Sequence, residues 1–117
     1  MIFKICHRAE WALAEKNGAY SGSAKDRDDG FLHFSTAAQL AGTLARYYAE
    51  AHDLVLIAVD ADALGNALKY EPSRDGALFP HLYGTLPLSA VRWIETLERD
   101  AAGAFVLPDM IAYARKA

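Results

Sequence analysis

Two short stretches combine histidine with aromatic and hydroxyl side chains in a way that could bind a ligand. "DGFLHFST" places His33 just before Ser35 and Thr36, and "LFPHLYG" places His81 two residues before Tyr83. Residues two apart on a strand share one face. His81 and Tyr83 can therefore hold a planar group by stacking and hydrogen bonding. In the alternative, His33 is a core histidine bound by a carbonyl group, and Phe79, His81 and Tyr83 form an aromatic stripe of the core.

The position of His33 favours contact with an anion. Thr36 and Gln39 have the spacing of a capping box, which predicts a helix from Thr36 to about Glu50 with Tyr48 on its apolar stripe. The first N–H groups of a helix carry partial positive charge and attract phosphate oxygens. The same charge disfavours an imidazolium, so a neutral His33 is expected, with Ser35 and Thr36 as its polar neighbours in a ligand site.

Glu71 is the carboxylate expected near this site. In "KYEP", Pro72 holds the preceding Glu71 in an extended conformation. Its side chain would then approach the face that carries His81 and Tyr83. In the alternative, Glu71 is a solvated acid at a strand end.

Other chemistries have weaker signals. His33 and His81 with Glu71 or Asp29 could form a two-histidine, one-carboxylate metal site, but no HxH or HExxH spacing arranges them in advance. No residue is therefore assigned to a metal. The chain also lacks GxSxG, GxGxxG and P-loop motifs, so no cofactor is predicted from a motif.

The elements that must position these residues mix strands and helices irregularly. This order predicts an α+β fold with a mostly antiparallel sheet. The segment 18–30, "GAYSGSAKDRDDG", is rich in turn-forming residues and is predicted to be a long surface loop that closes over a ligand. The expected strands cover 2–7, 31–35, 53–60, 68–72, 78–84, 91–97 and 103–108, and the expected helices cover 8–17, 36–50 and 108–117. The stretch 90–99 could also be a helix, but the alternation over 91–97 favours a strand.

Composition limits the classes of partner. Residues 1–117 are expected to form a single domain. The net charge of −3, from 12 basic and 15 acidic side chains without a basic block, argues against duplex nucleic acid. No apolar run reaches the roughly 20 residues that cross a bilayer, so no membrane partner is expected. "MIFKICHRAEW" lacks the pattern of a secretory signal, which predicts a cytoplasmic protein.

The sequence also resembles a known family nearly end to end. "EWALAEKNGAYSGSAKDRDDGFLHFSTAAQL" and "LFPHLYGTLPLSAV" are similar to the bacterial family called domain of unknown function 952, with "DGFLHFST" and "FPHLYG" as the most specific parts. This resemblance implies an ADP-ribosyltransferase-like fold, which is a split antiparallel β core with peripheral helices and a cleft that holds NAD in the enzymes. It implies that His33 contacts the nicotinamide ribose and that Tyr83 or Tyr48 stacks on nicotinamide. It also implies that Glu71 orients a ribose hydroxyl.

Three functions follow from these observations. The first is a domain that binds a nucleotide-type small molecule, similar to NAD or ADP-ribose, in a cleft lined by His33, His81 and Tyr83. The second is an ADP-ribosyltransferase or NAD-cleaving enzyme with NAD as its substrate and with Glu71 and His33 as catalytic residues. The third is a metal-dependent enzyme that uses the two histidines.

Overall fold

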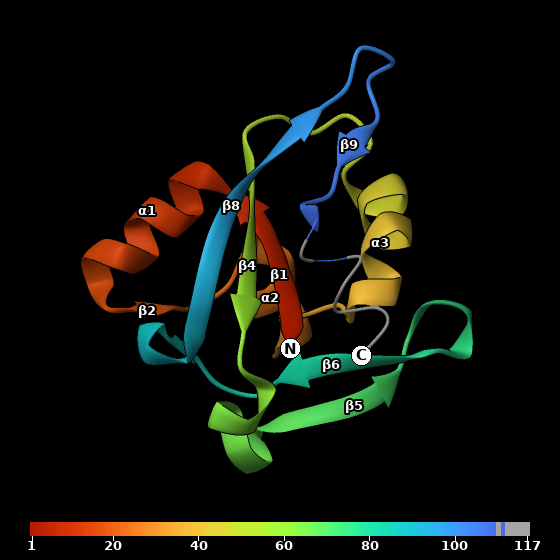
Figure 1. Cartoon of the computed structure of the whole chain (residues 1–117). Coiled ribbons are helices and arrows are strands. Elements are labelled where there is room, and N and C mark those ends of the chain that lie inside the picture. The colour runs from red at the N-terminus through yellow and green to blue at the C-terminus, as the bar shows by residue number, and fades with distance from the viewer. Residues whose placement is uncertain (110, 112–117) are drawn as a thin grey trace.

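The computed structural model describes residues 1–109 and 111 and is built from antiparallel sheets and short helices (Figure 1). One sheet has the strand order β1-β4-β8-β9, a second has the order β3-β6-β5, and β2 pairs with β7. This architecture confirms the α+β class. The strands are β1 (Ile2–His7), β2 (Ala19–Tyr20), β3 (Leu32–His33), β4 (Leu54–Val59), β5 (Leu68–Pro72), β6 (Leu78–Leu82), β7 (Leu86–Pro87), β8 (Val91–Arg99) and β9 (Phe105–Val106).

Two helices cover opposite faces of the four-stranded sheet (Figure 1). All six residues of β4 are buried, as expected for the apolar run 54–59. Val55 and its alternate neighbours pack with Trp11 of α1, whereas Leu54 and its alternate neighbours pack with Leu40 and Leu44 of α3. The helices are α1 (Arg8–Asn17), α2 (Ala24–Asp29) and α3 (Leu40–Tyr47), and 3₁₀ turns cover Ala37–Gln39, Ala61–Ala67, Arg74–Gly76 and Leu88–Ala90.

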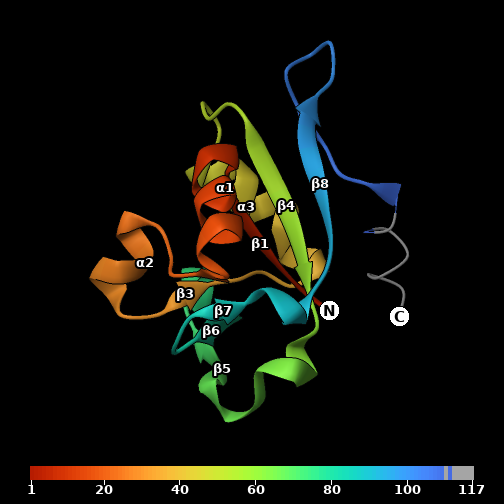
Figure 2. The same ribbon diagram turned by 90° about the vertical axis from the view of Figure 1, so that its left-hand side faces the viewer.

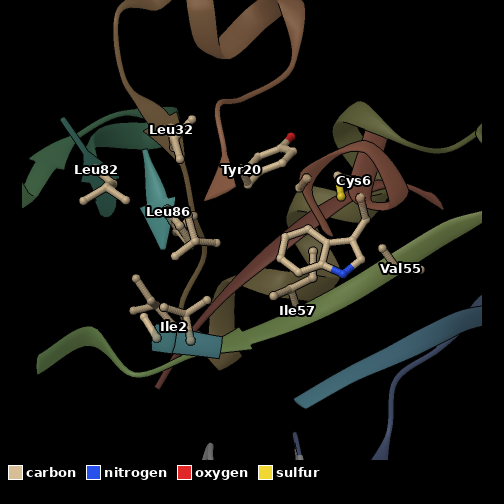
Figure 3. Packing of buried hydrophobic residues seen from close by; sticks show 13 residues of the cluster. Ile2, Cys6, Tyr20, Leu32, Val55, Ile57, Leu82 and Leu86 are labelled. Atoms are coloured by element: carbon tan, nitrogen blue, oxygen red, sulfur yellow. The ribbon is translucent and has the colours of Figure 1, made fainter. Parts of the chain in front are cut away.

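One hydrophobic cluster joins the sheets to each other. Val55 and Ile57 of β4 lie in the same cluster as Leu32 of β3, Leu82 of β6 and Leu86 of β7 (Figure 3). Burial of apolar side chains contributes about 25 cal/mol for each Å² removed from water, so this shared cluster strongly favours one arrangement of the two sheets. The junction between the sheets is therefore a fixed part of the fold.

The prediction of a loop over 18–30 is wrong. This segment contains β2 and the six-residue helix α2. The Ser23 hydroxyl accepts from the N–H of Asp26 at 3.2 Å, and the Asp26 carboxylate accepts from the N–H of Ser23 at 2.9 Å. These reciprocal bonds form a capping box that starts the helix. Gly30, with φ of +85°, ends it.

The helix expected over 36–50 is shorter than predicted. A 3₁₀ turn occupies its beginning, and α3 ends at Tyr47. The side chain of Arg99 explains this end, because it donates to the carbonyl oxygens of Ala49 at 2.9 Å and Ala51 at 2.7 Å. These bonds hold the chain in a non-helical path after the helix.

The remaining expected elements are present where the structure describes them. The strands expected over 2–7, 68–72 and 91–97 are β1, β5 and β8, and the helix over 8–17 is α1. The terminal helix expected over 108–117 lies largely outside the described residues. Among the described helices, none combines the length and apolar character needed to cross a membrane.

Gly22 fixes the approach of the chain to α2 and is predicted to be intolerant of a side chain. Its φ is +105°, and a Cβ there would lie 2.7 Å from Leu32 Cδ2 and 2.8 Å from the Asp26 Cβ. We expect Gly22→Ala to lower the free energy of unfolding by roughly 2–5 kcal/mol, the sum of a left-handed backbone and overpacking. Urea denaturation measures this loss.

Gly103→Ala is the matched control, because Gly103 has φ of +86° and no atom within 4 Å of an added Cβ. It should cost only the backbone part, about 1–2 kcal/mol. Equal losses in the two variants would show that the close contacts at Gly22 are unimportant.

Candidate functional site

A cavity of about 250 Å³ lies at the junction of the two larger sheets. Residues of β1, β3 and β6 line it, and α2 and α3 contribute side chains to its wall. Figure 2 shows α2, β3 and β6 close together on one side of the molecule. This cavity is where the histidines and hydroxyl groups singled out in the sequence can meet.

His33 and His81 lie next to each other on neighbouring strands. They are direct partners in the antiparallel register of β3 and β6, and their ring centroids are 5.7 Å apart. Both side chains line the cavity. The structure therefore brings together the two stretches in which the sequence analysis found candidate residues.

Phe31 occupies the planar position beside these histidines. Its ring stacks on His81, with centroids 4.0 Å apart and planes inclined by 22°. It also lies 4.7 Å from the ring of His33 and 5.3 Å from that of Tyr83. The planar group that was expected to stack on His81 is thus supplied on one side by the chain itself. The sequence analysis did not assign this contact to Phe31.

Glu71 lies beside His81 and Tyr83, as expected from the sequence. Its Oε1 atom accepts from the hydroxyl of Tyr83 at 2.7 Å and contacts Nδ1 of His81 at 2.8 Å. The hydrogen bond from Tyr83, followed by that from His81, holds the pKa of Glu71 below its usual value. The same carboxylate raises the pKa of Tyr83, because a phenolate would face it. His81 lines the cavity, whereas Glu71 and Tyr83 are not among the described residues that line it.

A buried ion pair that the sequence analysis missed supports His33. Lys4 is 3% exposed and Asp26 is 2% exposed. The Lys4 ammonium donates to Asp26 Oδ2 at 2.8 Å, to Asp26 Oδ1 at 3.1 Å and to the carbonyl oxygen of His33 at 2.9 Å. The only available signal was a lysine within the otherwise apolar strand "IFKIC".

The carboxyl group of Asp26 is ionised in this environment. Burial alone would raise its pKa, but hydrogen bonds from His33 and the charge of Lys4 outweigh burial and hold the pKa of Asp26 well below its usual range. Asp26 Oδ1 also accepts from the backbone N–H of His33 at 3.1 Å. Asp26 is therefore fixed to both β1 and β3.

The ring of His33 contacts carboxylates from α2 at both nitrogens. Nδ1 contacts Asp26 Oδ1, and Nε2 lies 2.9 Å from Asp29 Oδ2. Carboxylates only accept hydrogen bonds, so both contacts are hydrogen bonds at once only when each ring nitrogen carries a proton. A neutral ring, which the sequence suggested, satisfies one of them. The sequence analysis expected the positive end of the helix after Thr36 to dominate the surroundings of His33. In the structure, two carboxylates from α2, those of Asp26 and Asp29, contact its ring instead.

The remaining predicted ligand-binding residues lie in different positions. Ser35 lines the cavity, and its hydroxyl is 2.9 Å from that of Thr43. Tyr48 also lines the cavity, and it donates to the carbonyl of Ile5 at 3.3 Å. Burial raises the pKa of Tyr48 to about 12. Thr36 is not in the described cavity lining, and its N–H donates to Gln39 Oε1 at 3.0 Å.

Arg74 is a cavity residue that had no signal in the sequence. Its guanidinium carbon lies 4.9 Å from the ring centroid of Phe79 and 5.9 Å from that of Tyr47. Its Nη1 atom is 3.5 Å from the hydroxyl of Thr43. Gly42 makes room for it, since a Cβ there would lie 3.1 Å from Nη2. Among the described residues, no carboxylate lies within 4.0 Å of Arg74.

The geometry gives no support to the third function, a metal-dependent enzyme. Within residues 1–109 and 111, no group of three or more His, Cys, Asp or Glu side chains is arranged to hold a metal ion. Three of the four ring nitrogens of His33 and His81 already contact carboxylates.

Neutralising Asp26 should destabilise the protein in a pH-dependent way. We expect Asp26→Asn to lower the free energy of unfolding by about 3–5 kcal/mol near neutral pH, because it leaves Lys4 buried without its partner. The pKa of Asp26 is depressed in the folded state, so its contribution is complete above the unfolded pKa of about 4 and declines as pH falls below it. Urea denaturation should show that the difference in the free energy of unfolding between Asp26→Asn and the parent becomes smaller from pH 7 to pH 3.

Asp53→Asn is the control, because Asp53 forms an exposed pair with Arg8 at 3.0 Å. It should cost less than about 1 kcal/mol. If the difference in the free energy of unfolding between Asp26→Asn and the parent stays constant on acidification, Asp26 is not ionised in the folded protein.

Comparison with known proteins identifies relatives for nearly the whole chain. The crystal structure of CC0527 from Caulobacter crescentus is 46% identical, with a TM-score of 0.89 over 95% of this chain and 97% of that chain. The solution NMR structure of CC0527 is also 46% identical, with a TM-score of 0.83 over 96% and 97% of the two chains. Comparison with curated proteins gives no match. The family model described as protein of unknown function (DUF952) matches residues 5–94, and the chain belongs to this family.

Proposed function

We propose that the cavity binds a nucleotide-type small molecule, similar to NAD or ADP-ribose, with a phosphate group at Arg74. The observation that carries this proposal is a guanidinium that lines the cavity and has no carboxylate partner among the described residues. Arginine is well suited to phosphate because its planar donors match two phosphate oxygens. The rings of Phe79 and Tyr47 limit the orientations that this guanidinium can adopt.

Other groups around the cavity suit the remaining parts of such a ligand. The hydroxyls of Ser35 and Thr43 form a polar patch that can bond to ribose or phosphate oxygens. Tyr47 is 53% exposed and lines the cavity, so its ring is available for stacking with a base. An aromatic surface next to a phosphate-binding cation is typical of nucleotide recognition.

The proposal includes an ADP-ribosyltransferase-like arrangement of the sheets. It is supported by two separate antiparallel sheets with a cavity at their junction and with α1 and α3 at the periphery. A fold of this kind hosts both enzymes and binding domains, so function has to be argued from the site.

A second candidate function is NAD cleavage or ADP-ribosyl transfer, and one feature of Glu71 favours it. Its Oε1 atom is held by Tyr83 and His81, while no described residue forms a hydrogen bond with Oε2. An ionised carboxylate with one free oxygen could accept from a ribose hydroxyl and stabilise positive charge on the ribose as nicotinamide leaves. His33 on β3, which β6 separates from β5, would then contact the same ribose.

Loss of the Arg74 charge should weaken nucleotide binding. We expect Arg74→Gln to raise the Kd of AMP and ADP-ribose by about 10- to 100-fold, the effect of losing a charged hydrogen bond. The binding of adenosine, which has no phosphate, should change little. Isothermal titration calorimetry measures all three ligands.

Arg92→Gln provides the control for the change in net charge. Arg92 pairs with Asp60 at 2.7 Å and does not line the cavity, so this variant should bind AMP like the parent. Equal binding by Arg74→Gln and the parent would refute the assignment of phosphate to Arg74. No heat with AMP, ADP-ribose or NAD at millimolar concentration would refute the nucleotide proposal itself.

Nicotinamide release separates the enzyme from the binding domain. If NAD is cleaved, we expect Glu71→Gln to slow release by about 100-fold or more, because the amide cannot supply the negative charge. Chromatography of NAD incubated with each protein measures the rate, and Glu95→Gln on β8 is the matched control. Release that survives in Glu71→Gln would remove Glu71 from the mechanism. Bound NAD without release would leave the binding domain as the function.

A further inference from the structure

A single carboxylate oxygen on the cavity wall is contacted by two donors. Asp29 Oδ2 lies 2.9 Å from Nε2 of His33 and 3.3 Å from the ammonium of Lys25. All three side chains line the cavity. An imidazole N–H and an ammonium that converge on one oxygen form the same donor set that binds a phosphate oxygen.

Asp29 is held much less firmly than its neighbour Asp26. The Asp29 side chain is 38% exposed, whereas that of Asp26 is 2% exposed. Asp26 accepts from the backbone of Ser23 and His33 as well as from Lys4, so it cannot move without leaving buried groups unsatisfied. Within residues 1–109 and 111, the Asp29 carboxylate bonds only to two partly exposed side chains, those of His33 and Lys25.

The place of Asp29 in the chain also favours displacement. It is the last residue of α2, and Gly30 with φ of +85° follows it. A negative charge at the C-terminal end of a helix is disfavoured by the backbone dipoles. Exposed ion pairs contribute little to stability, so exchange of one anion for another at His33 and Lys25 costs little.

We propose that the Asp29 carboxylate occupies an anion subsite and that a phosphate group of the ligand replaces it at His33 Nε2 and Lys25 Nζ. This proposal rests on the nucleotide-type ligand proposed above. It adds a second phosphate position, which differs from the one at Arg74 because a carboxylate of the protein occupies it. Arg74 is free of carboxylates, whereas the His33–Lys25 subsite is filled by the protein until the ligand arrives. His33 therefore acts as a ligand-binding residue through Nε2, while Asp26 orients it through Nδ1.

The test compares two neighbouring acids on α2 with two ligands that differ by one phosphate. We expect Asp29→Asn to tighten ADP binding by about 2- to 5-fold, the equivalent of losing a competing exposed pair. The binding of AMP, whose single phosphate is assigned to Arg74, should stay unchanged. Asp28→Asn makes the same charge change on the same helix, but Asp28 is exposed and does not line the cavity, so it should have a smaller effect. Calorimetry gives the Kd values.

Two further measurements identify the donors. Lys25→Gln should weaken ADP binding and leave AMP binding unaffected. ADP, but not AMP, should shift the ¹⁵N resonances of the His33 ring in the parent protein. Both results are needed for a phosphate that bonds to His33 and Lys25.

The outcomes separate this inference from the proposed function. ADP binding that depends on Arg74 but is equal in Asp29→Asn and Asp28→Asn, or weaker in Asp29→Asn, would overturn the subsite and leave the nucleotide proposal standing. Failure of AMP, ADP, ADP-ribose and NAD to bind the parent and Asp29→Asn would overturn both.

Discussion

The buried pair between Lys4 and Asp26 is the interaction on which the site depends. Removing two charges from water costs several kcal/mol for each ion, so such a pair is tolerated only when nearly every donor and acceptor is satisfied. Here the ammonium has three acceptors, and the carboxylate also accepts from the backbones of Ser23 and His33. This requirement ties β1, the start of α2 and β3 to one another. The position of α2 then determines where Lys25 and Asp29 meet the cavity.

The two sides of the cavity are consequently held by different forces. On the α2 side, hydrogen bonds to charged groups fix His33 in one orientation. On the other side, Arg74 rests on the faces of Phe79 and Tyr47 and makes only a long contact of 3.5 Å with Thr43. Cation–π contacts at exposed sites contribute about 0.5–1 kcal/mol, so this guanidinium can adjust to a ligand more readily than the imidazole can.

Sequence patterns predicted the parts of the structure that depend on local periodicity. The buried apolar run of β4 and the shared face of His81 and Tyr83, which both contact Glu71, follow from strand patterns. The helix α2 was missed because its polar composition resembles a loop, although Ser23 and Asp26 have capping-box spacing. Lys4 and Arg74 could not have been placed from the sequence. Their roles depend on contacts with residues 22 and 31 positions away, which no local pattern encodes.

Most polar groups at the cavity are already bonded within the protein, and this determines where binding energy can come from. His33 contacts Asp26 and Asp29, Ser35 contacts Thr43, and Glu71 is held by Tyr83 and His81. A ligand that bonds to these groups exchanges one hydrogen bond for another, with little net gain unless the displaced group is solvated easily. Asp29 meets that condition because it is partly exposed, whereas Asp26 does not. In the proposed function, net affinity would therefore come mainly from Arg74, from the donors that Asp29 would release and from the aromatic wall, a combination that suits a phosphorylated, planar molecule.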